Sequence, residues 1–304
     1  MIRAAFLKSA RPSQRKESRG DMEITRRMKD ARFPDQAWII ERMSGNTAVR
    51  RSGQRGAMTT TSKIEWTEQT WNPATGCTKI SPGCKHCYAE TMSRRLRAMG
   101  VRGYENGFQL SILPERLVEP LKRRKPTTYF VNSMSDLFHK DIPFEFLDQV
   151  FDVIKRTPQH TYQILTKRAA RMHKYFTPGE RCVPGNVWLG VSVENRKHGL
   201  PRIDELREIE ASIRFLSVEP LLEDIGEIDL HGIHWVIVGG ESGPKARPMK
   251  PEWVASIKEQ CEQRGVAFFF KQWGGWGADG KKRRKKDNGR LFAGKTWDGM
   301  PAIV

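Results

Sequence analysis

Three cysteines within eleven residues form the densest group of reactive side chains in the sequence. They are Cys77, Cys84 and Cys87, with the spacing C-x6-C-x2-C. A thiolate is a soft ligand, and three converging thiolates suit an iron–sulfur cluster or zinc. Closed structural zinc sites and electron-transfer clusters normally take four protein ligands. A set of three therefore predicts one metal position that is open to another molecule.

The residues around the cysteines predict how they converge. Pro82-Gly83 predicts a turn that folds the spacer back and brings Cys84 toward Cys77. Cys87 opens a helical stretch, Tyr88 to Met99, and a helix N-terminus favours negative charge. A disulfide with one free thiol is disfavoured because the sequence shows no secretory signal. A zinc site that adds His86 or a distant histidine stays open beside the iron–sulfur cluster.

These motifs carry a family resemblance. The stretch from Ile64 to Pro73, with Gly76-Cys77 and Cys84 to Ala89, resembles the phage Gp37/Gp68 family (DUF5131), which is regarded as radical S-adenosylmethionine (SAM)-like. The resemblance runs from about Lys63 to Pro301. The first cysteine gap is three residues longer than in the usual radical SAM pattern, C-x3-C-x2-C. Further matching stretches are Phe130–Asp136, Leu165–Arg168, Val191–Asn195, Ser217–Pro220, Val238–Gly243 and Lys271–Trp273.

The resemblance implies a radical SAM-like enzyme. In such an enzyme Cys77, Cys84 and Cys87 would hold three irons of a [4Fe–4S] cluster, and the fourth iron would take the amino and carboxyl groups of SAM. An electron donor would reduce the cluster, and cleavage of SAM would give methionine and a 5′-deoxyadenosyl radical that abstracts hydrogen from a substrate. The alternative is a non-catalytic phage accessory protein that binds nucleic acid and is stabilised by zinc or a cluster at the same cysteines.

Apolar runs and helical stretches alternate along the chain after the cysteines. Several runs are apolar throughout, such as Trp235–Val238, which is typical of strands buried on both faces of a parallel sheet. Repeated strand–helix units predict an α/β fold, a TIM-like partial (β/α)6 barrel with an extra C-terminal strand, and a doubly wound open sheet is the alternative. The expected strands are Thr70–Asn72, Thr128–Asn132, Tyr162–Thr166, Val187–Val193, Ile213–Val218, His234–Gly239 and Val266–Phe270.

Amphipathic stretches between these runs predict the helices. Phe144–Lys155 places its apolar residues at helical spacing, and Leu200–Glu210 and Glu252–Gln263 are similar. Leu110 to Lys122 reads as a short extended piece followed by a helix.

Polar residues follow the apolar strands, and in a parallel barrel the strand ends form the active site. Asn132, Ser133 and Asp136 follow the second strand and are the positional candidates for the methionyl or ribose groups of SAM. Ser192, at the end of the fourth strand, is a further candidate for binding the cofactor. Gly239-Gly-Glu241 resembles the Gly-Gly-Glu stretch with which radical SAM proteins bind the SAM amino group, although it follows the sixth strand here instead of the second.

Two near-repeats at strand ends supply the catalytic candidates. Val191-Ser-Val-Glu194 and Leu216-Ser-Val-Glu219 each place a Ser and a Glu on the same side of an extended chain. A buried carboxylate needs a cationic or hydrogen-bonding partner, for which Lys167, Arg168 and Lys271 are available. We expect Glu194 and Glu219 to bind substrate or SAM, with Lys271 as a charge partner. The alternative is that both glutamates cap the following helices.

Charge and composition divide the chain into three parts. Residues 1–57 contribute +8 of the net charge of +18, and their composition predicts a disordered basic extension. Either translation starts at Met58 and the extension is not part of the protein, or the extension is an arm that binds nucleic acid. Residues 58–275 are the expected barrel. Residues 276–304 are the expected basic tail, where Lys281–Lys286 contributes +6, so the remainder carries only +4. Nucleic acid is thus a candidate partner, and with no apolar span we expect a cytoplasmic protein without a membrane partner.

Overall fold

The computed structural model describes residues 64–177, 179 and 181–302. These residues belong to one compact unit, Arg51–Val304. The basic extension expected at residues 1–57 lies outside the described residues. The boundary expected at 275/276 stays a prediction.

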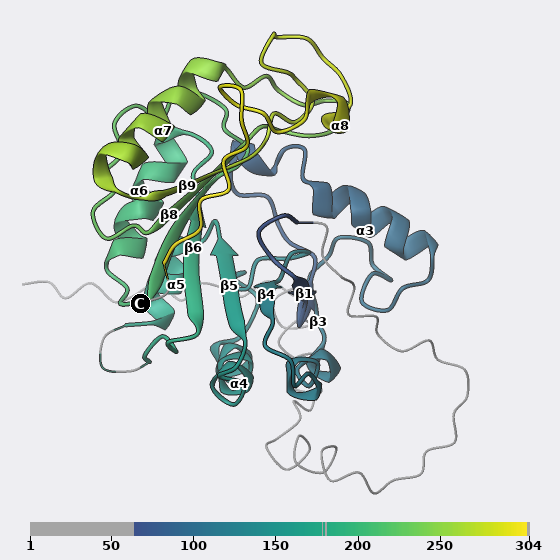
Figure 1. The fold of residues 1–304 in the computed structure, drawn as a ribbon. Coiled ribbons are helices and arrows are strands. Elements are labelled where there is room, and N and C mark those ends of the chain that lie inside the picture. The colour runs from purple at the N-terminus through teal and green to yellow at the C-terminus, as the bar shows by residue number, and fades with distance from the viewer. Residues whose placement is uncertain (1–63, 178, 180, 303–304) are drawn as a thin grey trace, which may run out of the picture. The chain divides into compact units, whose positions relative to one another are not determined.

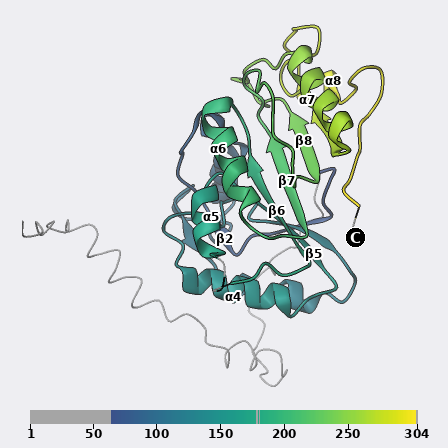
Figure 2. The same cartoon turned by 90° about the vertical axis from the view of Figure 1, so that its left-hand side faces the viewer.

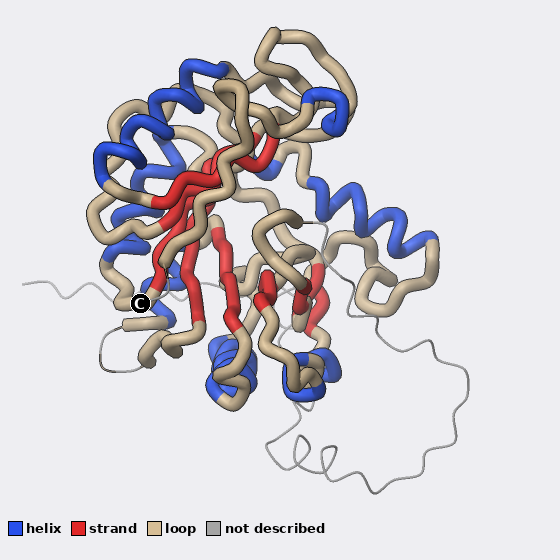
Figure 3. The backbone as a smooth tube through the Cα atoms, viewed as in Figure 1, coloured by secondary structure: helices blue, strands red, loops and turns tan. Residues whose placement is uncertain are grey.

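Seven parallel strands form one curled sheet, as expected from the apolar runs (Figure 1, Figure 3). The strands follow one another in space in the same order as in the sequence, each hydrogen-bonded to the next. A doubly wound sheet reverses its strand order at a switch point, so that alternative is wrong. The TIM-like partial barrel is confirmed. The strands are β1 (Gln69–Trp71), β4 (Thr128–Val131), β5 (Thr161–Thr166), β6 (Val187–Ser192), β7 (Ile213–Val218), β8 (Trp235–Gly239) and β9 (Ala267–Gln272).

Helices in the crossovers cover the outside of this sheet, and Figure 2 shows α4, α5 and α6 lying on that face. Four of the expected helices, α3, α4, α6 and α7, are present, with ends that shift by up to four residues, and α5 and α8 are additional. Asn195 begins α6 four residues early because its side chain caps the helix, accepting a hydrogen bond from the His198 N–H at 3.1 Å. The helices are α3 (Tyr88–Ala98), α4 (Phe144–Lys155), α5 (Ala169–Tyr175), α6 (Arg196–Arg207), α7 (Pro251–Arg264) and α8 (Lys285–Asn288).

The segment from Leu110 to Lys122 differs from the expected helix. It contains the short strand β3 (Ser111–Ile112), which pairs antiparallel with β2 (Ala74–Thr75). Two 3-10 turns follow, Pro114–Arg116 and Pro120–Lys122. Each turn begins at a proline, and Pro120 cannot donate the hydrogen bond that a continuous α-helix would need there. The extended piece is therefore confirmed and the helix is wrong.

Aromatic side chains fill the inner face of the curled sheet. Trp66, which precedes β1, packs against Phe130 and Trp235 with ring centroids 4.9 and 6.0 Å apart. Trp188, Phe215 and Phe269 complete this buried cluster. The polar ends of the strands lie beyond it, so the aromatic cluster forms the floor beneath the site. None of the helices in the described part of the chain is long and apolar enough for a membrane span.

The end of the chain adds a further layer at the outer edge of the sheet. Phe270 donates its N–H to the Trp297 carbonyl at 2.9 Å, and Gly299 donates to the Phe268 carbonyl at 3.0 Å. The Trp235 indole donates to the Gly299 carbonyl at 2.7 Å. The two backbone bonds pair Trp297 and Gly299 with β9, which is otherwise an edge strand, and the indole bond ties Gly299 to β8.

Gly190 in β6 gives a direct test of this packing. A Cβ built at Gly190 would lie 2.4 Å from the Phe215 ring, so we predict that Gly190→Ala destabilises the protein by about 1–3 kcal/mol. Phe215→Leu in the same chain should recover part of that loss, measured by urea unfolding. Gly185→Ala is the control, because no atom lies within 4 Å of its Cβ position. Strictly additive effects of Gly190→Ala and Phe215→Leu would contradict the predicted contact.

Candidate functional site

The cysteine loop follows β2 and lies at the ends to which the parallel strands run. The expected turn is present as a 3-10 turn, Pro82–Cys84, and Cys87 is the N-cap residue of α3. The three thiols are free and partly buried, and Cys77 lies within electrostatic reach of Cys84. Across residues 64–177, 179 and 181–302, no three His, Cys, Asp or Glu side chains are grouped around a position for a single metal ion.

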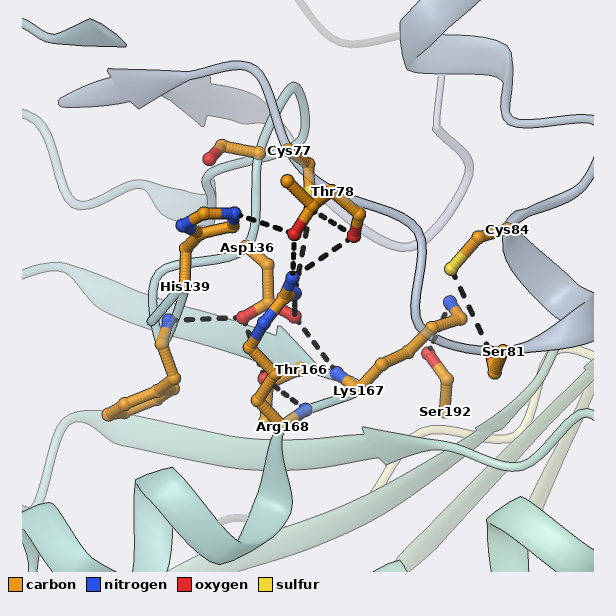
Figure 4. A network of polar contacts seen from close by, with 12 residues as sticks. Cys77, Thr78, Ser81, Cys84, Asp136, His139, Thr166, Lys167, Arg168 and Ser192 are labelled. Atoms are coloured by element: carbon orange, nitrogen blue, oxygen red, sulfur yellow. Dashed lines mark hydrogen bonds and ion pairs between the residues drawn. The ribbon is translucent and has the colours of Figure 1, made fainter. Parts of the chain in front are cut away.

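Asp136 organises the rim beside Cys77 (Figure 4). Its carboxylate joins the end of β4 to the end of β5, and both of its oxygens accept hydrogen bonds from the chain itself. This use of both oxygens makes Asp136 a connector between strand ends. The donors are Phe138 N at 3.0 Å, Thr166 Oγ1 at 2.7 Å, Lys167 N at 3.1 Å and Arg168 Nη1 at 3.0 Å.

Arg168 carries this connection to the cysteine loop. Its Nη2 donates to the carbonyl and to the hydroxyl of Thr78, both at 3.0 Å, and its Nη1 lies 3.5 Å from the Cys77 sulfur. Burial and the Asp136 carboxylate raise the pKa of the Cys77 thiol, and the Arg168 guanidinium opposes them. Arg168 therefore places a cation where a thiolate would need one.

His139 supports the same end of the loop from below. It is fully buried, and its Nδ1 accepts the N–H of Asp141 at 3.2 Å. Nε2 must then carry the proton, which it donates to the Thr78 hydroxyl at 2.9 Å. Burial and the nearby Arg168 lower the pKa of His139, which favours this neutral form.

Glu194 lies under the turn of the loop. It is fully buried, and Arg202 of α6 donates to its Oε2 at 2.6 Å and to its Oε1 at 3.4 Å. A Cβ at Gly83 would lie 3.1 Å from the Glu194 side chain, so the turn rests directly on it. Burial alone would raise the pKa of Glu194, but hydrogen bonding from Arg202 and the charge of Lys167 outweigh it and lower that pKa.

Glu241 supplies a third connection, from the end of β8. Arg247 binds both of its oxygens, with Nη2 2.6 Å from Oε1 and Nε 2.9 Å from Oε2. The same Nη2 donates to the Pro82 carbonyl of the cysteine loop at 2.9 Å. Burial opposes ionisation of Glu241, but the hydrogen bonds from Arg247 lower its pKa. Asp136–Arg168, Glu194–Arg202 and Glu241–Arg247, here called the three clamps, thus all meet this loop.

Glu219 and Lys271 form a different kind of pair. Lys271 Nζ lies 2.6 Å from Glu219 Oε2, which confirms the expected charge pairing. The other oxygen, Oε1, is buried and has no hydrogen-bond partner among the residues that the structure describes. Lys271 Nζ also lies 5.9 Å from the centre of the Trp66 ring, so the pair lies directly above the aromatic floor. Glu219 therefore keeps one acceptor for another molecule.

The remaining predicted residues lie around the ends of β4 and β6. Asn132 has a left-handed backbone (φ 55°), accepts the Ala74 N–H at 3.3 Å with Oδ1, and leaves its buried Nδ2 without a partner. The Ser133 hydroxyl donates to Asn72 Oδ1 at 3.2 Å, and its carbonyl accepts the Tyr88 hydroxyl. Ser192 Oγ accepts from Lys167 Nζ at 3.0 Å. Their roles toward SAM stay predictions.

Sequence reasoning missed Arg202, Arg247 and His139. The signal for Arg202 was available, because it occupies a buried face of α6 together with Ile203 and Leu206. A cation at such a position needs an acidic partner, and Glu194 precedes it by eight residues. Arg247 follows Glu241 in a segment without helix or strand, where no periodic pattern predicts the direction of its side chain.

Comparisons with known proteins place these observations in a family. The sequence model described as "Protein of unknown function (DUF5131)" matches residues 61–301. No curated protein matches the chain.

Two similar solved structures are both spore photoproduct lyase variants. One, bound to a dinucleoside spore photoproduct, is 14% identical with a TM-score of 0.42, covering 69% of this chain and 65% of its own. Another is 13% identical with a TM-score of 0.47, covering 72% of this chain and 80% of its own. Substrate and cofactor therefore have to be argued from this chain's own residues.

The Glu194–Arg202 clamp predicts a pH-dependent loss of stability. Arg202→Met leaves a buried carboxylate without its cation, so we expect a loss of about 3–5 kcal/mol near pH 7. Without Arg202 the pKa of Glu194 rises, and the penalty shrinks as pH falls because protonation removes the charge. Denaturant unfolding at neutral and mildly acidic pH measures both values. In the wild type the pKa of Glu194 is lowered, so the clamp's contribution is complete above the unfolded-state pKa and is lost as pH falls through the folded one.

Two results bear on that prediction. Arg284→Gln removes an exposed arginine paired with Asp287 and should leave unfolding unchanged at either pH. An Arg202→Met penalty that is equal at both pH values would mean that lost packing, not the uncompensated charge, is its source.

Proposed function

The chain belongs to the DUF5131 family, and we propose that it is a radical SAM-like iron–sulfur enzyme whose cluster site is the cysteine loop. One observation carries the proposal. Three free thiols of one short loop lie at the carboxyl ends of a parallel half-barrel, where such folds place their active sites, and three clamps hold that loop there.

The donor set fits a cluster with one open iron. Cys77, Cys84 and Cys87 would hold three irons of a [4Fe–4S] cluster, and a set of three protein thiolates leaves the fourth iron for SAM. The Arg168 guanidinium beside Cys77 and the N-terminus of α3 at Cys87 favour the negative charge of bound thiolates. When bound, the cluster supplies the electron for reductive cleavage of SAM, which starts hydrogen abstraction from the substrate.

The carboxylates of the rim fall into two groups, according to whether both oxygens or only one accept hydrogen bonds from this chain. Asp136, Glu194 and Glu241 use both oxygens on donors of this chain. We therefore assign them a positioning role, in place of the direct contact with SAM or substrate that the sequence suggested. Lys167 binds Ser192 and lowers the pKa of Glu194, which joins Ser192 to the same network.

Glu219 and Lys271 are left for the bound molecules. Lys271 pairs with one oxygen of Glu219 at the mouth, and the other oxygen, Oε1, can accept a hydrogen bond from a hydroxyl or amino group. Asn132 adds a free buried donor at Nδ2. The aromatic floor makes the lower wall of this space apolar, which strengthens each polar contact made against it.

The first test of the proposal is metal content. In protein purified without oxygen we expect iron and sulfide, and Cys77→Ala, Cys84→Ala or Cys87→Ala should each abolish iron loading because two thiolates hold a cluster poorly. Cys182→Ala and Cys261→Ala are the matched controls, since one thiol is exposed and the other is buried in α7. One zinc per chain would favour the zinc-stabilised alternative. Loss of iron in Cys182→Ala would indicate four ligands and no open iron.

The second test addresses the mouth. Glu219→Gln removes the charge that pairs with Lys271 but keeps the shape of the side chain, so we expect normal folding and iron loading with SAM binding or substrate conversion weakened about tenfold or more. SAM affinity by calorimetry and methionine release under reducing conditions are the measurements. Glu227→Gln, an exposed change of the same kind, is the control. Wild-type SAM affinity, cleavage and conversion in Glu219→Gln would exclude this role.

A further inference from the structure

Helix α3 leaves an apolar face open to solvent. Only Ala89 and Ser93 of this helix are buried. Tyr88, Met92 and Met99 are 58%, 40% and 74% exposed, and Arg95 is exposed between them. Residues at these spacings fall on one face of an α-helix, and we call Tyr88, Met92, Arg95 and Met99 the α3 stripe. Three large exposed apolar side chains on one helix face are typical of a binding surface.

The α3 stripe begins at the mouth of the half-barrel. The Tyr88 hydroxyl donates to the Ser133 carbonyl at the end of β4, and Tyr88 directly follows Cys87 of the cysteine loop. Tyr88 also lies within electrostatic reach of Glu219. With a rise of about 1.5 Å per residue, the stripe then runs roughly 16 Å outward along α3. A molecule lying on it would therefore enter the site at one end.

The surroundings of the stripe are strongly positive. Glu90 is the only acidic residue of α3, and Lys79 of the cysteine loop and Arg94 both pair with it, at 2.8 and 3.3 Å. Arg95 and Arg97 are exposed cations of the same helix. At the same end of the molecule, the exposed run Lys281–Lys286 leads into α8 (Figure 1). Within the described part of the chain, Arg283 and Arg284 are the members of that run that pair with carboxylates.

We propose that the α3 stripe binds a single-stranded nucleic acid and leads it into the mouth. Nucleic acid is the favoured partner because apolar side chains and an arginine alternate along the stripe. A tyrosine ring and two thioether side chains offer flat or adaptable surfaces for bases, and Arg95 between them offers a phosphate contact. An acidic protein would pair with the arginines and lysines around the stripe, but it would not require apolar side chains that alternate with an arginine. The claim that this nucleic acid is the enzyme's substrate rests on the proposed function. The claim that the α3 stripe binds it does not.

The experiment measures binding of a fluorescein-labelled single-stranded oligonucleotide of about 12 nucleotides, as DNA and as RNA, by anisotropy over a range of salt concentrations. Arg95→Gln in the stripe, combined with Arg94→Gln beside it on α3, should weaken binding about tenfold at low salt and reduce the slope of log K against log[salt] by about 1.4. Met92→Ser with Met99→Ser should weaken binding about fivefold or more and leave the slope unchanged, because stacking carries no charge.

Two matched variants control for general effects of charge and apolar area. Arg124→Gln with Lys125→Gln removes two exposed cations that precede β4, at the amino end of that strand. Leu291→Ser with Met300→Ser removes two other exposed apolar side chains. Both should bind within about twofold of wild type, since neither pair lies in the stripe.

Several outcomes would overturn the proposal. These are no binding of either oligonucleotide at low salt, equal losses in the stripe variants and their controls, or polyglutamate competing as well as the oligonucleotide. A dimer that Met92→Ser with Met99→Ser dissolves would also overturn it, because a second copy would then cover the stripe. Oligonucleotide binding by protein that holds no iron and cleaves no SAM would refute the proposed function alone. SAM cleavage without stripe-dependent binding would refute this inference alone.

Discussion

A buried carboxylate has to be paired, and this constraint organises the rim of the half-barrel. The cysteine loop has no core of its own, because its turn, Pro82–Cys84, buries no residue. Its position is set instead by the Asp136, Glu194 and Glu241 clamps, whose carboxylates follow β4, β6 and β8. Leaving such a group unpaired costs several kcal/mol, so the arginines that satisfy the carboxylates are held firmly, and they in turn hold the loop.

The parallel sheet makes this arrangement possible. Strands that follow one another in sequence and space bring all their carboxyl ends to one edge, so residues more than a hundred positions apart contact the same eleven-residue loop. Below that edge the aromatic cluster around Trp235 packs on the inner face of the sheet. The Glu219–Lys271 pair lies between these two layers, and among the rim carboxylates it is the one with an acceptor to spare.

Much of this arrangement could be predicted from the sequence. All seven strands of the sheet were predicted, and several of them stood out as apolar runs because strands buried on both faces need apolar residues throughout. Because a buried carboxylate needs a cation, Lys271 could be predicted as the partner of Glu219, since both residues lie at the ends of strands. It did not find Arg202 or Arg247, because their approach depends on how α6 and the segment after β8 return to the rim. Pro120 interrupted an otherwise helical pattern after Leu110, and α5 has only seven residues, too few for a clear periodic signal.

Two of the three clamps contact the loop through its backbone. Arg168 binds the Thr78 carbonyl and Arg247 binds the Pro82 carbonyl, which every residue type presents alike. The scaffold therefore specifies the path of the loop without specifying the side chains of Ile80, Lys85 and His86. In design terms the loop is an exchangeable segment. Its length, its cysteines, the Thr78 hydroxyl, the Lys79 ion pair and the close approach at Gly83 are fixed by contacts with the scaffold, whereas the other three positions are open to recombination with related loops.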